Sequence, residues 1–240
     1  MSALFLIRAF AYLILPLLLA GVVIAIDKSV NTRERRLEIF LIYVFAFSAA
    51  GGIAGALGHF FASDLVAEAI GWETGSPFQL EIGFANLALG VLAVIAIGRR
   101  DGFREATVIA GTIFGVGAFI VHMVDLAQTG NLAPGNIIIN INNLGRPALL
   151  ITFLWALRRE ERSPESEGNS DAYIDWQSSQ AALGGMAGGG VGAGLGMGIA
   201  LGQPLIGLVL GLIGGLALGM VMRRRTIVER QAKEGQPTGG

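Results

Sequence analysis

Seven apolar segments, separated by polar ones, follow one another along the chain. Each holds at least 18 residues, and a helix of that length reaches about 27 Å, close to the thickness of the hydrocarbon core of a bilayer. The pattern predicts an all-α, polytopic membrane protein with seven transmembrane helices. We expect these helices over residues 4–26, 39–62, 77–97, 106–126, 136–157, 181–201 and 205–222.

The composition supports this class and divides the chain into four parts. Of the 240 residues, 53% are hydrophobic, 15% are charged and 36 are glycine, which is too apolar for an ordinary soluble domain. A break rich in Ser, Glu and Asp precedes the last two apolar segments. We expect a five-helix transmembrane bundle (1–162), a polar cytoplasmic linker (163–180), a transmembrane hairpin (181–222) and a cytoplasmic tail (223–240).

Lysine and arginine occur in alternate connections. The connections after the first, third, fifth and seventh apolar segments hold 15 of the 17 Lys and Arg residues, and the other two, Arg8 and Arg146, fall inside segments. Because cytoplasmic loops of membrane proteins are enriched in these residues, we expect the N-terminus outside and the C-terminus in the cytoplasm. The lipid bilayer is the expected partner, and the net charge of −1 gives no indication of nucleic-acid binding.

The connection between the second and third segments contains a short predicted helix. Ser63 can cap a helix over residues 64–70, and Gly71 can end it. Trp72 follows, and its amphipathic ring is expected at the headgroup level of the membrane.

A second helix start lies a few residues further on. Ser76, Pro77 and Gln79 match a capping box with proline at the first helical position. Glu81 lies about one turn inside this helix, where a lipid-facing carboxylate would be costly. We expect Glu81 to face protein or water, and the alternative is that it is shallow enough to reach the membrane interface.

The chain has only two histidines, and each ends a stripe of small residues. The spacing i, i+4, i+7, i+11 places each stripe on one helix face, and small residues let helices approach closely in lipid. Both histidines are therefore expected inside the bundle near its outer end, with Asp125 on the face of the second. The stripes are Ser48, Gly52, Gly55 and His59, and Gly111, Gly115, Ala118 and His122.

The fifth segment carries a polar stripe. Asn136, Asn140 and Asn143 repeat at i, i+4, i+7, and Arg146 falls near the same face, about 15 Å from the outer end at 1.5 Å per residue. A buried arginine needs a partner. One interpretation is a polar vestibule open to the outside with Arg146 at its floor, and the other is an internal ion pair that fixes helix packing. The candidate partners are Asp125, Glu81 and an anionic ligand.

These polar residues together define a candidate site with four open interpretations. It could be a protonatable relay or ligand site, a zinc or iron site, or a haem held between His59 and His122. In the fourth, each histidine only hydrogen-bonds a neighbouring helix. The candidate residues for a ligand or proton site are His59, Glu81, Asn86, His122, Asp125, Asn140, Asn143 and Arg146.

The last two apolar segments each carry four glycines at strict i+4 spacing, and residues 181–222 contain no ionisable side chain. This glycine-zipper pattern predicts close helix packing, within the hairpin, against the first five helices, or with a second copy or another subunit of a membrane complex. A pore formed by oligomers is a further alternative. The glycines are Gly184, Gly188, Gly192, Gly196, Gly207, Gly211, Gly215 and Gly219.

Several protein classes are excluded by missing motifs. A retinal protein needs a lysine in the membrane, but Lys28 and Lys233 both lie outside the apolar segments. The chain has no cysteine for disulfide or thiolate chemistry. It also lacks a G-x-S-x-G elbow, an HExxH helix and a P-loop, so nothing indicates a hydrolase or an ATPase.

One short signature carries a resemblance to a family. At Gly71-Trp72, Gly75-Ser76-Pro77-Phe78-Gln79, Glu81 and Asn86-Leu87, the chain resembles uncharacterised prokaryotic membrane proteins that share a GW..GSPFQ.E signature. The resemblance covers roughly residues 37–160. It implies a small multi-helix domain of a prokaryotic cytoplasmic membrane and no established activity, and the glycine-zipper hairpin looks like an addition to it.

Three functions are consistent with the sequence. The first is a membrane protein that handles a small ligand or protons through an outward-facing polar site, of which a transporter is one form. The second is a structural or accessory subunit that docks through its glycine zippers. The third is a redox protein with a haem or metal at the two histidines. No catalytic motif indicates an enzyme.

Overall fold

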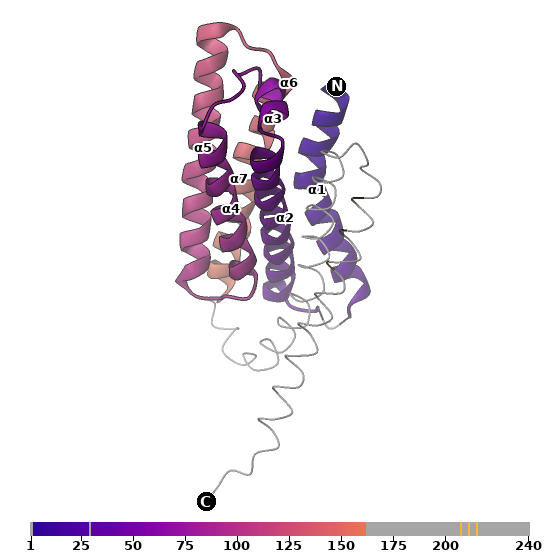
Figure 1. Ribbon diagram of the computed structural model, residues 1–240. Coiled ribbons are helices and arrows are strands. Elements are labelled where there is room, and N and C mark those ends of the chain that lie inside the picture. Colours follow the sequence, from indigo (N-terminus) through magenta and orange to yellow (C-terminus); the bar gives the residue numbers. More distant parts are fainter. Residues whose placement is uncertain (1, 29, 162–206, 208–210, 212–214, 216–240) are drawn as a thin grey trace, which may run out of the picture.

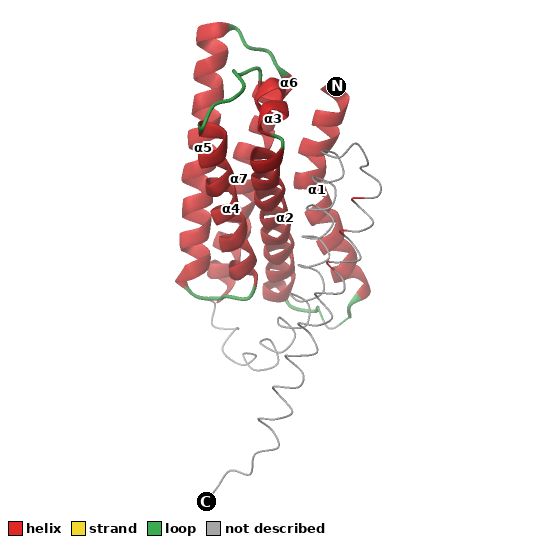
Figure 2. Ribbon diagram, in the orientation of Figure 1, coloured by secondary structure: helices red, strands yellow, loops and turns green. Residues whose placement is uncertain are grey.

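The computed structural model describes residues 2–28 and 30–161, together with Gly207, Gly211 and Gly215. Within these ranges every regular element is a helix (Figure 2). The predictions for the linker, the glycine-zipper hairpin and the tail lie outside the described residues, apart from these three glycines, which are helical.

The described chain forms five long helices and two short ones. The short helices precede α4 and α7 along the chain. Each long helix matches one of the first five predicted apolar segments, and five segments are long and apolar enough to cross a membrane, α6 and α7 counting together. The helices are α1 (Ser2–Ile26), α2 (Arg33–Phe61), α3 (Ser63–Ile70), α4 (Phe78–Ile97), α5 (Gly102–Thr129), α6 (Pro134–Ile137) and α7 (Ile139–Glu161).

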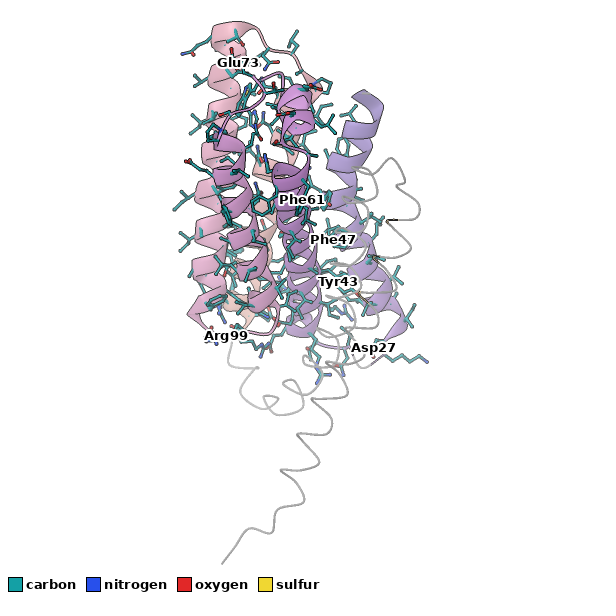
Figure 3. The ribbon with its side chains drawn as sticks, in the orientation of Figure 1. Asp27, Tyr43, Phe47, Phe61, Glu73 and Arg99 are labelled. Carbon is teal, nitrogen blue, oxygen red and sulfur yellow. The ribbon has the colours of Figure 1, made fainter. Side chains whose placement is uncertain are left out.

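The helices α2, α4, α5 and α7 form an antiparallel four-helix bundle (Figure 1). α2 packs on α4 and α7, and α5 packs on the same two helices, so α2 and α5 occupy opposite corners. α1 packs outside this bundle against α2 and α7. The bundle has two ends. Glu73 lies at one, which we call the α3–α6 end, and Asp27 and Arg99 lie at the other, which we call the Arg104 end (Figure 3).

Local capping explains where several helices begin and end. α2 and α5 start before their apolar segments because the side chains of Thr32 and Asp101 accept backbone N–H groups three and two residues later, at 3.2 and 3.1 Å. Gly71 ends α3 in the left-handed conformation, with φ of 83°, as predicted. The predicted Ser63 cap is wrong, because Ala62 holds the N-cap position of α3 without a side-chain hydrogen bond.

Glycines bring pairs of helices into close contact. A Cβ added at Gly52 of α2 would lie 2.8 Å from the Cα atom of Gly90 of α4, and a Cβ at Gly115 of α5 would overlap the carbonyl oxygen of Asn143 of α7. By contrast, a Cβ at Gly111 would meet none of the described residues within 4 Å. The two small-residue stripes therefore pack differently, the first on α4 and only part of the second on α7.

Buried side chains differ between the two ends of the bundle. Toward the Arg104 end the core is apolar, with Phe45 of α2, Ile97 of α4, Val108 of α5 and Leu157 of α7 in one cluster. Toward the α3–α6 end the buried residues on α5, α6 and α7 include a histidine and several asparagines. These are His122, Asn136, Asn140, Asn142 and Asn143.

Ion pairs surround the Arg104 end. Arg104 and Glu38 are both 0% exposed, with N···O distances of 2.7 and 2.9 Å. In the sequence these arginines indicate only the topology, and their pairs with Glu34, Glu38 and Glu105 could not be predicted because these acidic residues lie on other helices. The surrounding pairs are Arg100–Glu34 (3.2 Å), Arg158–Glu105 (2.6 Å) and Arg158–Glu161 (2.7 Å).

Candidate functional site

A hydrogen-bonded group of side chains at the α3–α6 end forms the candidate site, named here the His122 cluster. The imidazole of His122 is buried, its Nδ1 lies 2.6 Å from Oδ1 of Asn136, and its ring stacks on that of Trp72 with 5.3 Å between centroids. The members of the cluster are Trp72, His122, Asp125, Asn131 and Asn136.

The hydrogen bonds of Asn136 determine the tautomer of His122. The Nδ2 group of Asn136 donates to the carbonyl oxygen of Asn131 at 2.9 Å, so its Oδ1 atom accepts. His122 therefore donates through Nδ1, and its Nε2 atom is the acceptor in the neutral imidazole. No described residue hydrogen-bonds Nε2.

Asp125 joins three parts of the chain. Its Oδ2 atom accepts from Nε1 of Trp72 at 3.1 Å and from Nδ2 of Asn131 at 2.7 Å, and its Oδ1 atom accepts from the hydroxyl of Thr129 at 3.3 Å. The sequence placed Trp72 at the headgroup level and gave it no protein partner. In the structure its indole ring packs on the bundle, and both contacts depend on residues about 50 positions away.

Asn131 holds the two short helices together at this end. Its Nδ2 group donates to the carbonyl oxygen of Ile70 at 2.9 Å, and its Oδ1 atom accepts the backbone N–H of Ala133 at 3.0 Å. Gly135 of α6 packs so closely on α3 that a Cβ there would overlap the carbonyl oxygen of Ala69. The sequence missed Asn131, because an asparagine in a polar loop carries no periodic signal.

His59 lies in a different environment. Its Nδ1 atom is 2.7 Å from Oε1 of Gln79 at the start of α4. The predicted capping box used the Gln79 side chain to bond its own helix terminus, but the structure directs this side chain to α2. Ser76 accepts the backbone N–H of Phe78 at 3.3 Å, but Pro77 holds the N-cap position of α4 without a side-chain hydrogen bond. The helix therefore starts one residue later than predicted, and the capping box is not formed.

The asparagines of the fifth predicted segment form a run along α6 and α7. The Nδ2 group of Asn140 donates to the carbonyl oxygen of Asn136 at 2.9 Å, and that of Asn143 donates to Oδ1 of Asn140 at 3.1 Å. Asn86 of α4 donates to the carbonyl oxygen of Ile82 in its own helix at 2.9 Å. Asn86 is therefore not part of this run.

Arg146 does not continue the asparagine run. A Cβ at Gly51 of α2 would lie 2.7 Å from an Nη atom of Arg146 and 3.4 Å from the ring of Tyr12 of α1. The guanidinium thus lies in the junction of α1, α2 and α7. The predicted pairing with Asp125 or Glu81 is not formed among the described residues: Asp125 bonds Trp72, Thr129 and Asn131, and Glu81 is exposed in the first turn of α4.

Metal or haem binding stays a prediction. Within the described ranges no three His, Asp or Glu side chains lie close enough together to hold a metal ion. Each histidine uses Nδ1 for an amide oxygen, Gln79 for His59 and Asn136 for His122. Such bonds are typical second contacts of a metal-ligating imidazole and also of a histidine that only joins two helices.

The fold and the site have the features of a helical membrane protein. The described chain is all-helical, has five candidate membrane-spanning helices and buries amide and imidazole groups between them, as multi-pass membrane proteins do around polar sites.

The chain belongs to a family of unknown function, DUF6790, whose sequence profile matches residues 8–163. This range contains the four-helix bundle and most of α1, and it ends before the predicted glycine-zipper hairpin. Neither a curated protein nor a solved structure is significantly similar to the chain.

Proposed function

We propose that this is an integral protein of a prokaryotic cytoplasmic membrane that binds a small polar ligand at the α3–α6 end, on the outer side. The observation that carries the proposal is the hydrogen bond between His122 and Asn136, two side chains that are more than nine-tenths buried. It begins a run of amides that continues through Asn140 to Asn143. Polar groups inside a membrane bundle are costly, and they mark binding and transport paths.

The chemistry of the run favours a ligand over a proton relay. Amide groups donate and accept hydrogen bonds, but they do not titrate. Protons handed to His122 would find no ionisable group at Asn136, Asn140 or Asn143. A molecule with N–H or O–H donors can bond Nε2 of His122.

Acetamide is a suitable probe, because it carries both a donor and an acceptor. Full-length protein with ¹⁵N-labelled histidine would be placed in lipid nanodiscs and titrated with acetamide. We expect a saturable change in the Nε2 chemical shift of His122 and none for His59, and the H59Q variant assigns the two signals. The N140L variant should weaken the response, whereas Q128L, at an exposed amide on α5, should not. An Nε2 signal that acetamide leaves unchanged would contradict the proposal.

A second candidate function is a structural subunit, with docking through the glycine zippers. The observation that supports it is the helical conformation of Gly207, Gly211 and Gly215, which close packing through the zippers requires. If docking is the function, replacing Gly211 and Gly215 by Leu should release a partner that copurifies with the wild-type protein. The His122 variants should leave that partner bound.

A further inference from the structure

One buried amide on α7 has an oxygen without a hydrogen-bond partner among the described residues. Asn142 of α7 is 5% exposed, and its Oδ1 atom is buried and hydrogen-bonds no described residue. A buried acceptor without a partner costs free energy that the surrounding protein must offset. A buried acceptor without a hydrogen-bond partner points to a molecule or ion that is bound beside it.

Arg146 lies one helical turn from Asn142 and on the same side of α7. Residues four apart on a helix are neighbours, with Cβ atoms about 6 Å apart. The guanidinium of Arg146 is held close to the backbone of Gly51 and the ring of Tyr12. The neighbouring Gly145 meets Leu13 of α1, with 2.6 Å from an added Cβ to the side chain. Gly145 and Arg146 therefore face α1 and α2, whereas the backbone of Asn143 lies against Gly115 of α5.

We propose that Asn142 and Arg146 bind a small carboxylate or inorganic oxyanion in the α1–α2–α7 junction. Arginine stays charged in any environment, and its planar fork fits an oxyanion. The Asn142 amide can turn about its last bond to present its NH2 group to the same anion, or keep its oxygen toward an O–H of a hydrogen-bearing one. Because Gly51 packs closely on Arg146 and Gly145 on Leu13, the proposed anion is one of a few atoms.

Formate is the probe, because it is the smallest carboxylate. Full-length protein in a neutral detergent would be unfolded by heat while tryptophan fluorescence is followed, with formate replacing gluconate at constant ionic strength. An anion that binds only the folded protein raises the midpoint with a saturable dependence on concentration. We expect this rise in the wild type, and an apparent Kd at least about tenfold higher in N142L and N142D, in line with the loss of one charge-assisted contact.

Matched controls separate the site from general effects of charge and salt. The variants Q128L and Q128E make the same chemical changes at an exposed amide and should respond to formate as the wild type does. H122Q should also keep the formate response, because His122 lies on α5 and bonds Asn136 rather than Asn142 or Arg146. The formate test is therefore independent of the acetamide test. R146Q should abolish the response, and if it fails to fold, the two Asn142 variants decide.

Two results would overturn the proposal. The first is a wild-type midpoint that shows no saturable difference between formate and gluconate, together with an N142L variant that is equally or more stable in both salts. This would mean that only water or nothing occupies the site. The second is a formate response in N142L and N142D equal to that of the wild type.

Discussion

At the residue scale, burial decides what an arginine contributes. The guanidinium of Arg104 has no exposed surface, and it donates to both oxygens of Glu38 and to the carbonyl oxygens of Ala96 and Ile97. Arg99 pairs with Asp101 at the surface, where both side chains are about half exposed, and this hydrogen bond holds the pKa of Asp101 below its ordinary value. The first pair needs its partners to remain buried, whereas water can replace those of the second.

Breaking the buried pair should therefore destabilise the protein strongly. We expect Arg104→Met or Glu38→Gln to lower the free energy of unfolding by about 3–5 kcal/mol, because each leaves a buried partner without its counterpart. Arg99→Met, the matched control at the same end, should change it little, because its partner Asp101 stays hydrated. Equilibrium unfolding in mixed micelles measures all three. A cost of Arg99→Met equal to that of Arg104→Met would show that burial is not the deciding factor.

At the element scale, the glycines of α5 show how packing depends on the neighbouring helix. Gly111 and Gly115 are four residues apart in one small-residue stripe, but only Gly115 lies against another backbone, at the carbonyl oxygen of Asn143. The spacing alone predicts the same role for both. Their difference follows from the point at which α7 crosses α5.

This difference gives a matched pair of substitutions within one helix. Gly115→Ala should destabilise by about 1–3 kcal/mol, because its Cβ would push α7 away. Gly111→Ala should be neutral or stabilising by up to about 1 kcal/mol, since alanine favours the helix and its Cβ meets none of the described residues there. Unfolding in mixed micelles again provides the measurement. Equal effects at the two positions would contradict the close contact of α5 and α7.

At the scale of the whole molecule, the proposed orientation assigns the α3–α6 end to the outside. Glu73 lies at that end and Arg99 at the other, and both are exposed (Figure 3). The expected orientation comes from the distribution of Lys and Arg residues. The ion pairs at the Arg104 end are consistent with it, but they would form equally well in the inverted protein.

Single cysteines test this orientation without background, because the chain has no cysteine. In intact spheroplasts, a maleimide that cannot cross membranes should label Glu73→Cys. It should label Arg99→Cys only after the membrane is permeabilised. The reverse pattern would place the α3–α6 end in the cytoplasm, and the ligand proposed at His122 would then enter from inside the cell.

The sequence by itself determined the helical class, the first five candidate spans and the stop at Gly71, because these depend on apolar runs and on hydrogen bonds within a turn or two. Only the tertiary structure decided the partners of the polar side chains. Trp72 bonds Asp125 across 53 positions, Arg104 bonds Glu38 across 66 and His59 bonds Gln79 across 20.

Arg146 illustrates the physical reason. It is three residues from Asn143, and on a helix of 3.6 residues per turn their directions differ by about 60°. That angle was small enough for the sequence to assign both to one polar stripe. In the packed bundle the backbone of Asn143 lies against α5, whereas the guanidinium of Arg146 lies against α1 and α2, because the rotation of each helix is set by its contacts with its neighbours.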